Sequence, residues 1–191
     1  MKLCKLLLAV VGATVLLGAL VSTASANHLS SSTQSFRATW TSSEFIGGFG
    51  TVHCSLTLEG SLHSRTINKT VGSLIGFVTR ASVGPCPSGS ATILQATLPW
   101  HVQYAGFEGT LPRISSIRTN VIGSAFQIRE PSFGITCLST STASSPSTGT
   151  YTLTSGSVTS VTLGGSIPCG SFTGSLGGRS SSNSAQTITL I

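Results

Sequence analysis

Hydrophobic and polar residues alternate along several short stretches of the chain, a pattern typical of β-strands with one buried and one exposed face. The clearest stretch places apolar residues at every second position: Val52, Cys54, Leu56 and Leu58. Similar alternation predicts strands at residues 94–98, 100–104, 158–163 and 187–191. After residue 26, no stretch has a sustained apolar stripe with the period of about 3.6 residues expected for a helix.

Turn and loop residues separate these stretches. Residues 59–61 predict a short turn, and residues 62–67 predict the strand that returns from it. Three polar segments are expected to be surface loops, or disordered linkers: 27–35, the Ser/Thr-rich 139–150, and 180–184. Many short strands divided by turns predict an all-β, antiparallel domain, either a β-sandwich or a partly closed barrel of roughly eight to eleven strands.

The N-terminus has the three parts of a secretory signal peptide. Lys2 and Lys5 precede an apolar run over residues 6–20, and residues 24–26 read Ala-Ser-Ala. The apolar run is shorter than the roughly 18 to 20 residues needed to cross a bilayer. We therefore predict that residues 1–26 are a helical signal peptide, cleaved after Ala26, and that residues 27–191 form a secreted β-rich domain.

Four cysteines follow the signal peptide, as expected for two disulfides formed in an oxidising compartment. Cys54 and Cys86 are 32 residues apart (86 − 54), and Cys137 and Cys169 have the same spacing (169 − 137). Among the three connectivities, this spacing favours Cys54–Cys86 and Cys137–Cys169. It also predicts two duplicated halves, about 36–130 and 131–191. Zinc sites need more closely spaced cysteines, so we expect no metal.

The composition is rich in hydroxyl groups and poor in charge. The chain has 34 Ser, 26 Thr and 22 Gly, 4 Glu and no Asp. Without the two lysines of the signal peptide, 8 basic and 4 acidic residues give a net charge of +4. The basic residues form no run along the sequence, so we expect no nucleic-acid partner.

Enzyme chemistry has few candidates in this chain. Glu44 and Glu108 lie beside glycine-rich stretches and are the pair to consider for a glycosidase, although glutamates on solvated loops are the simpler interpretation. A Ser-His-Glu hydrolase would use His53, His63 or His101, but the chain has no G-x-S-x-G motif. We therefore predict no catalytic, cofactor-binding or metal-binding residues.

Three aromatic residues near Pro99 are the candidate ligand contacts: Trp100, Tyr104 and Phe107. Proline beside a strand favours a sheet edge or a strand start. An exposed tryptophan there would be able to stack on a sugar or an apolar ligand. The interpretation that we favour is a core tryptophan packed near a disulfide, as in many β-sandwiches.

Residues 51–126 resemble a group of small exported bacterial proteins. The similarity rests on Cys54, Glu59-Gly60, Cys86 and the Leu98-Pro99-Trp100 motif. Proteins of this group combine a signal peptide with two cysteines per half, and some are labelled protein activators of alkane oxidation. The resemblance implies an exported accessory factor without established catalytic residues. The Ser/Thr-rich second half of the chain departs from that pattern, and no functional residue is carried over.

Together these features predict a secreted, non-enzymatic protein that acts extracellularly or at the cell surface, by binding or by structural association. Its expected partner is a cell-surface polymer or an apolar ligand. One alternative is an extracellular hydrolase. Another is a self-assembling surface subunit or an accessory factor for the use of apolar substrates. Self-association would use the uncharged residues 187–191, which are able to pair with an open sheet edge.

Overall fold

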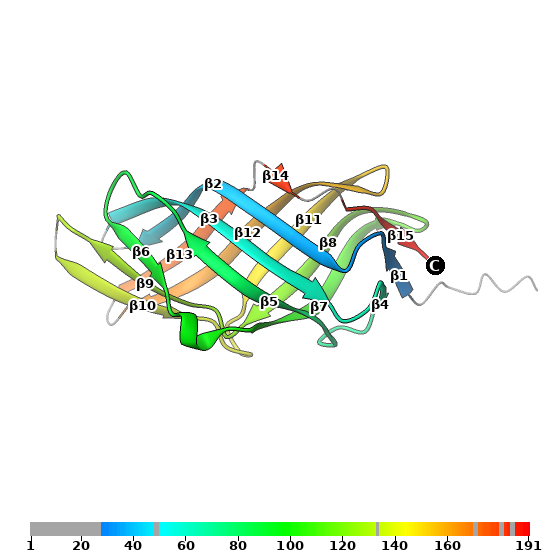
Figure 1. Cartoon of the computed structure of the whole chain (residues 1–191), viewed down its shortest axis with the longest axis horizontal. Helices are drawn as coiled ribbons and strands as arrows, with labels where there is room; N and C mark the ends of the chain where they lie inside the picture. The colour runs from blue at the N-terminus through cyan, green and yellow to red at the C-terminus, as the bar shows by residue number, and fades with distance from the viewer. Residues whose placement is uncertain (1–27, 48–49, 133, 170–171, 180–181, 184–185) are drawn as a thin grey trace, which may run out of the picture.

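The computed structural model describes residues 28–47, 50–132, 134–169, 172–179, 182–183 and 186–191. Its centre is an antiparallel ring of strands in which neighbours follow one another along the chain (Figure 1). The ring contains β2 (Ser35–Gly47), β3 (Gly50–Leu62), β5 (Leu74–Val83), β7 (Trp100–Thr110), β8 (Arg113–Ile122), β11 (Ser147–Thr154), β12 (Ser157–Cys169) and β13 (Phe172–Arg179). β13 pairs with β2 and closes the ring. The predicted all-β, antiparallel fold is confirmed as an up-and-down barrel.

Alternating side chains give the ring an apolar interior and a polar exterior. In β3 the side chains predicted to face inward are all buried: Val52, Cys54, Leu56 and Leu58. The largest fully buried side chains are aromatic and come from two ring strands, β2 and β7: Trp40, Trp100, Tyr104 and Phe45. The β7 residues Trp100 and Tyr104 therefore belong to the core of the barrel and not to an exposed edge.

Two small sheets lie at opposite ends of the ring (Figure 1). One contains β1 (His28–Ser31), β4 (Thr66–Asn68) and β15 (Ile188–Leu190), and the other contains β6 (Ser90–Ile93), β9 (Ala125–Glu130) and β10 (Ile135–Thr140). Phe126 of β9 packs against Phe45 and Trp100, with ring centroids 5.6 and 5.5 Å apart. This contact joins the second sheet to the core of the ring. The short β14 (Ser182–Asn183) pairs with β2.

The predicted turn at residues 59–61 and the return strand at 62–67 are wrong. β3 continues to Leu62, with a register irregularity between Glu59 and Gly60 opposite β5, and β4 starts only at Thr66. A Cβ atom on Gly60 would collide with the Phe77 carbonyl oxygen and lie 2.5 Å from Phe36 Cζ. Gly60 is therefore required where backbone and an aromatic ring approach closely within a strand.

The predicted strand at residues 94–98 is also wrong, because Gln95–Thr97 forms a short 3₁₀ helix. The Leu94 carbonyl accepts hydrogen bonds from the Thr97 N–H (3.0 Å) and the Thr97 hydroxyl (2.8 Å). A threonine hydroxyl that bonds to nearby backbone competes with strand pairing in this way. The alternation of Leu94, Ala96 and Leu98 was therefore a misleading signal.

Two of the predicted loops are shorter than expected. Residues 28–31 of the polar leader form β1, and the Ser/Thr-rich segment lies between β10, which ends at Thr140, and β11, which begins at Ser147. Ser139 and Ser141 are buried, and the Ser124 hydroxyl donates a hydrogen bond of 2.7 Å to Ser141 Oγ. Hydroxyl groups with such partners can be buried, so a high Ser and Thr content did not indicate an exposed loop in this segment. Of residues 180–184, only β14 is described.

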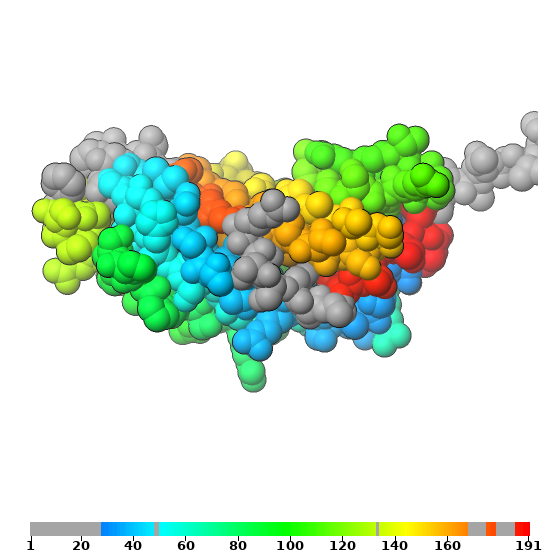
Figure 2. Space-filling model, turned by 90° about the horizontal axis from the view of Figure 1, so that it is seen from above, coloured from blue at the N-terminus to red at the C-terminus, as the bar shows by residue number. Residues whose placement is uncertain are grey.

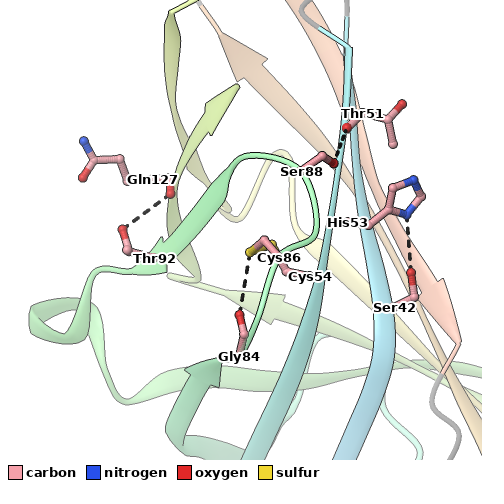
Figure 3. The surroundings of a disulfide bond; sticks show 9 residues. All are labelled: Ser42, Thr51, His53, Cys54, Gly84, Cys86, Ser88, Thr92 and Gln127. Atoms are coloured by element: carbon pink, nitrogen blue, oxygen red, sulfur yellow. Dashed lines mark hydrogen bonds between the residues drawn. A yellow bond between two sulfur atoms is a disulfide. The ribbon is translucent and has the colours of Figure 1, made fainter. Parts of the chain in front are cut away.

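The disulfide between Cys54 and Cys86 is confirmed, with an S–S distance of 2.05 Å. It ties the segment after β5 to β3 (Figure 3). Cys137 in β10 is also disulfide-bonded. The Cys169 side chain lies outside the described residues, so its pairing with Cys137 stays a prediction, as does the duplication into two halves.

The predicted signal peptide, residues 1–26, lies outside the described residues. Within the part of the chain that the structure describes, no helix has the length and apolar character needed to span a membrane.

Candidate functional site

The outward surface of β2, β3, β5 and β7 carries a cluster of charged and aromatic side chains, which we call the β2–β7 face. It consists of Arg37, Glu59, His63, Phe77, Arg80 and His101. In Figure 1 the strands that carry it cross the barrel side by side. All six residues sit on or directly beside paired strands, so their backbones have fixed positions.

Three of these residues form a charged row across neighbouring strands. Arg37 is opposite Glu59, and Glu59 is opposite Arg80. Arg37 Nε lies 3.3 Å from Glu59 Oε1, and Arg80 Nη1 lies 4.0 Å from Glu59 Oε2. The side chains of Arg37, Arg80 and Glu59 are 65%, 83% and 34% exposed. One carboxylate between two guanidinium groups leaves the row with a positive charge, and such exposed pairs contribute little to stability.

A row of three rings lies beside the charged row. Phe77 is opposite Ser61 on one side and His101 on the other. The His63 and Phe77 ring centroids are 4.8 Å apart in an edge-to-face arrangement, and those of Phe77 and His101 are 5.3 Å apart. Both histidines are exposed and Phe77 is half-buried. Ser61 is two residues beyond Glu59 on β3, so the two rows are about 7 Å apart along the strand.

Two shallow hollows flank Glu59 on this face, with volumes of about 400 and 300 Å³. Arg37, Glu59 and Arg80 line both of them. The second hollow also reaches Gln95, whose side-chain amide donates a hydrogen bond of 3.1 Å to the Ala81 carbonyl and fixes the 3₁₀ helix against β5. The charged side chains of this face therefore line its hollows.

The predicted ligand contacts do not form an exposed patch. Trp100 and Tyr104 are each 1% exposed, and the Trp100 indole N–H donates a hydrogen bond of 2.8 Å to the Thr97 hydroxyl. Phe107 is partly buried, and Lys69 Nζ lies 5.7 Å from its ring centroid. Trp100 and Tyr104 would be able to contact only a ligand inside the ring.

One cavity inside the described part of the ring is too small for such a ligand. It has a volume of about 20 Å³ and a mainly apolar wall, with Thr119, Tyr151 and Gln186 as its polar members. That volume holds about one water molecule, whereas sites for drug-sized ligands measure roughly 300–1,000 Å³. Burial raises the pKa of Tyr151 to about 12, against a smaller lowering effect of the hydrogen bond with Thr119. Burial also raises the pKa of Tyr104, which is lowered in part by the charge of Arg118.

The histidine and glutamate candidates for hydrolysis do not form a catalytic triad. Ser42 Oγ lies 3.4 Å from His53 Nδ1 (Figure 3), and Glu44 Oε1 lies 3.8 Å from the same nitrogen. In a triad the serine hydroxyl contacts one ring nitrogen of the histidine, and the acid contacts the other ring nitrogen and orients the ring. Here both partners lie beside Nδ1. His63 and His101 instead flank Phe77 on the β2–β7 face.

The two glutamates considered for a glycosidase lie far apart in the fold. Glu44 is near the β2–β3 hairpin, and Glu108, 4.0 Å from Arg118, is near the β7–β8 hairpin. In an up-and-down ring these hairpins lie at opposite ends. The two carboxylates therefore do not face one another across a cleft. Among the described residues, no group of three or more His, Cys, Asp or Glu side chains is placed to hold a metal ion.

A second surface feature is a groove of about 570 Å³ between the β7–β8 hairpin and β15. Figure 2 shows this hairpin, in green, rising beside the yellow and orange strands β11 and β12. The groove is lined by Pro112 and Ile114 on the hairpin and by Ile188 and Leu190 on β15. β15 pairs with β1 on one side and is the edge strand of its three-stranded sheet, so the predicted self-association through residues 187–191 stays a prediction.

The sequence pattern missed the charged row of the β2–β7 face, because Arg37 and Arg80 come from separate strands. Alternation shows which way each side chain points, but only the strand register brings these arginines to the same carboxylate. Comparisons with family models, curated proteins and solved structures find no match for this chain. The resemblance to exported activators of alkane oxidation therefore stays a prediction.

Proposed function

We propose that this protein is exported and non-enzymatic, and that it binds an extracellular polysaccharide through the β2–β7 face. The observation that carries this proposal is the row of His63, Phe77 and His101, whose rings lie 4.8 and 5.3 Å apart on an outward sheet surface. Aromatic rings beside polar groups suit sugars, which present both C–H faces and hydroxyl groups. Phe77 supplies the apolar contact in this arrangement.

The interior of the barrel supports this choice of surface. Its cavity of about 20 Å³ is far smaller than a sugar or a hydrocarbon ligand would need. Binding at the exterior requires no opening of the ring. A paired sheet face also holds its side chains in place before the ligand arrives, which lowers the entropic cost of binding.

Co-sedimentation with insoluble cellulose, chitin and calcium alginate tests the proposal, using the protein that begins at residue 27. We expect the protein to bind at least one of these polymers, and Phe77→Leu to weaken that binding roughly two- to thirteenfold, the effect of losing an aromatic contact of roughly 0.5–1.5 kcal/mol. Leu keeps an apolar side chain at this half-buried position, so the variant measures the contribution of the aromatic ring of Phe77.

The matched control is Leu138→Ala, which removes an exposed apolar side chain from β10, outside the β2–β7 face. This variant should bind as the wild type does. The proposal fails if no polymer sediments the wild-type protein, or if Phe77→Leu binds as well as the wild type while both remain folded.

A further inference from the structure

We propose that the polysaccharide bound at the β2–β7 face is anionic, with carboxylate or sulfate groups that Arg37 and Arg80 contact together. This inference rests on the proposed function and adds the chemical class of the ligand. It comes from the charged row, which is separate from the aromatic row that carries the proposed function. Guanidinium groups bind carboxylates and sulfates through paired N–H donors.

The charge of the row favours an anion. Glu59 is the acidic member of the face, and two arginines lie beside it. Two of the other glutamates already have partners elsewhere, Glu44 next to the His53 ring and Glu108 next to Arg118. The charged row of the β2–β7 face therefore has one negative and two positive charges.

Arg80 is well placed to exchange its intramolecular contact for a ligand. It approaches Glu59 only to 4.0 Å, which is longer than a hydrogen bond, and its side chain is 83% exposed. A guanidinium group carries five N–H donors. A weak, exposed pair of this kind costs little to break, so an incoming anion competes well for Arg80.

The spacing of the two arginines favours a polymer with repeated charges over a single small anion. Arg37 and Arg80 lie on either side of β3, so their backbones are about 10 Å apart, two strand spacings. The two hollows that flank Glu59 lie on this row. Successive acidic groups of one polysaccharide would contact both arginines. Once the first contact has formed, the second forms at a higher effective concentration, which raises the affinity.

Isothermal titration calorimetry with soluble polygalacturonate, dextran sulfate and neutral dextran tests the inference. We expect the wild type to bind one or both anionic polymers, and Arg37→Gln/Arg80→Gln to weaken that binding roughly tenfold or more. The single variant Glu59→Gln should bind roughly two- to fivefold more tightly, because it removes the competing carboxylate. The control Arg113→Gln/Arg129→Gln makes the same charge change outside the face and should bind as the wild type does.

The three polymers separate the possible outcomes. Binding of polygalacturonate alone identifies carboxylates, and binding of dextran sulfate alone identifies sulfates. Binding of neutral dextran with equal affinity, still weakened by Phe77→Leu, would overturn the anionic ligand and leave the proposed function standing. An unchanged affinity in both Arg37→Gln/Arg80→Gln and Glu59→Gln would also overturn it. No binding to these polymers or to the insoluble ones would overturn both proposals.

Discussion

The indole N–H of Trp40 donates a hydrogen bond to the Val161 carbonyl oxygen, 3.0 Å away in the buried core. The two residues lie on β2 and β12, which are not neighbours in the ring because β13 lies between them in the strand order. This bond joins the first ring strand to one near the end of the chain. The bond therefore links the first ring strand to the last part of the ring through the buried core.

Trp40→Phe should therefore lower the free energy of unfolding by about 2 kcal/mol, from the lost hydrogen bond and the smaller buried ring. Urea denaturation followed by circular dichroism measures this change. A loss below about 0.5 kcal/mol, the range of a neutral surface substitution, would contradict the structural role given to this bond.

Gly60→Ala should destabilise the protein by about 3 kcal/mol or prevent folding, because the added methyl group meets the Phe77 carbonyl and the Phe36 ring. Gly177→Ala is the matched control, since a Cβ there has no atom within 4 Å. Thermal unfolding of the two variants gives the comparison. Equal melting temperatures would show that β3 does not pass as closely to Phe36 and Phe77 as described.

Both tyrosines of this chain should lose their protons only above the ordinary tyrosine pKa of 10.0. Burial raises the pKa of Tyr104, and raises that of Tyr151 from 10.0 to about 12. In a spectrophotometric titration, the native protein should show little phenolate at pH 10, while the protein in denaturant should show about half of its full phenolate absorbance there. Equal curves for the two states would contradict the burial of both rings.

The same pKa shifts predict how stability depends on alkaline pH. Between about pH 10 and about pH 12 the folded state holds protons that the unfolded state has lost. The stabilising effect is thus complete below pH 10 and disappears as the pH rises through the folded pKa. Tyr151→Phe should reduce this alkaline loss of stability in urea titrations at pH 9 and pH 11, and an unchanged loss would count against Tyr151 as its source.

Disulfide mapping by mass spectrometry should find Cys54 linked to Cys86, and Cys137 linked to Cys169. Replacing Cys54 and Cys86 by alanine opens a loop with a sequence separation of 32 residues. On the chain-entropy estimate this lowers stability by about 3 to 4 kcal/mol. A link from Cys137 to any other residue would overturn the second pairing and remove the spacing argument for duplicated halves.

The alternation of apolar residues predicted the parts of the fold in which local pattern and tertiary packing agree. Val52 to Leu58 is such a case, because each apolar side chain faces the ring interior. The pattern failed at Gly60 and at Leu94 to Leu98. Gly60 lies within a strand because it allows close packing there and does not form a turn. At residues 94–98, the Thr97 hydroxyl bonds to the Leu94 carbonyl and stabilises a helical turn in place of a strand.

The candidate site was less predictable than the fold. Trp100 was weighed both as a ligand contact and as a core residue, and it is buried and fills the core beside Phe126. His63 and His101 were considered for hydrolysis and set aside, but the sequence did not show that the register places them on either side of Phe77. Sequence pattern indicates whether a side chain points in or out, whereas the partners of an outward side chain depend on strand register.

Mapping of backbone amide chemical shifts by NMR tests most directly whether the exterior or the interior of the barrel is the binding surface. An isotope-labelled protein would be titrated with a soluble oligosaccharide of the polymer that it binds. We predict that the largest shifts fall on the outward residues Ser61, Phe77, Arg80 and His101. Shifts concentrated instead on Thr119 and Tyr151, at the interior cavity, would contradict binding through the β2–β7 face.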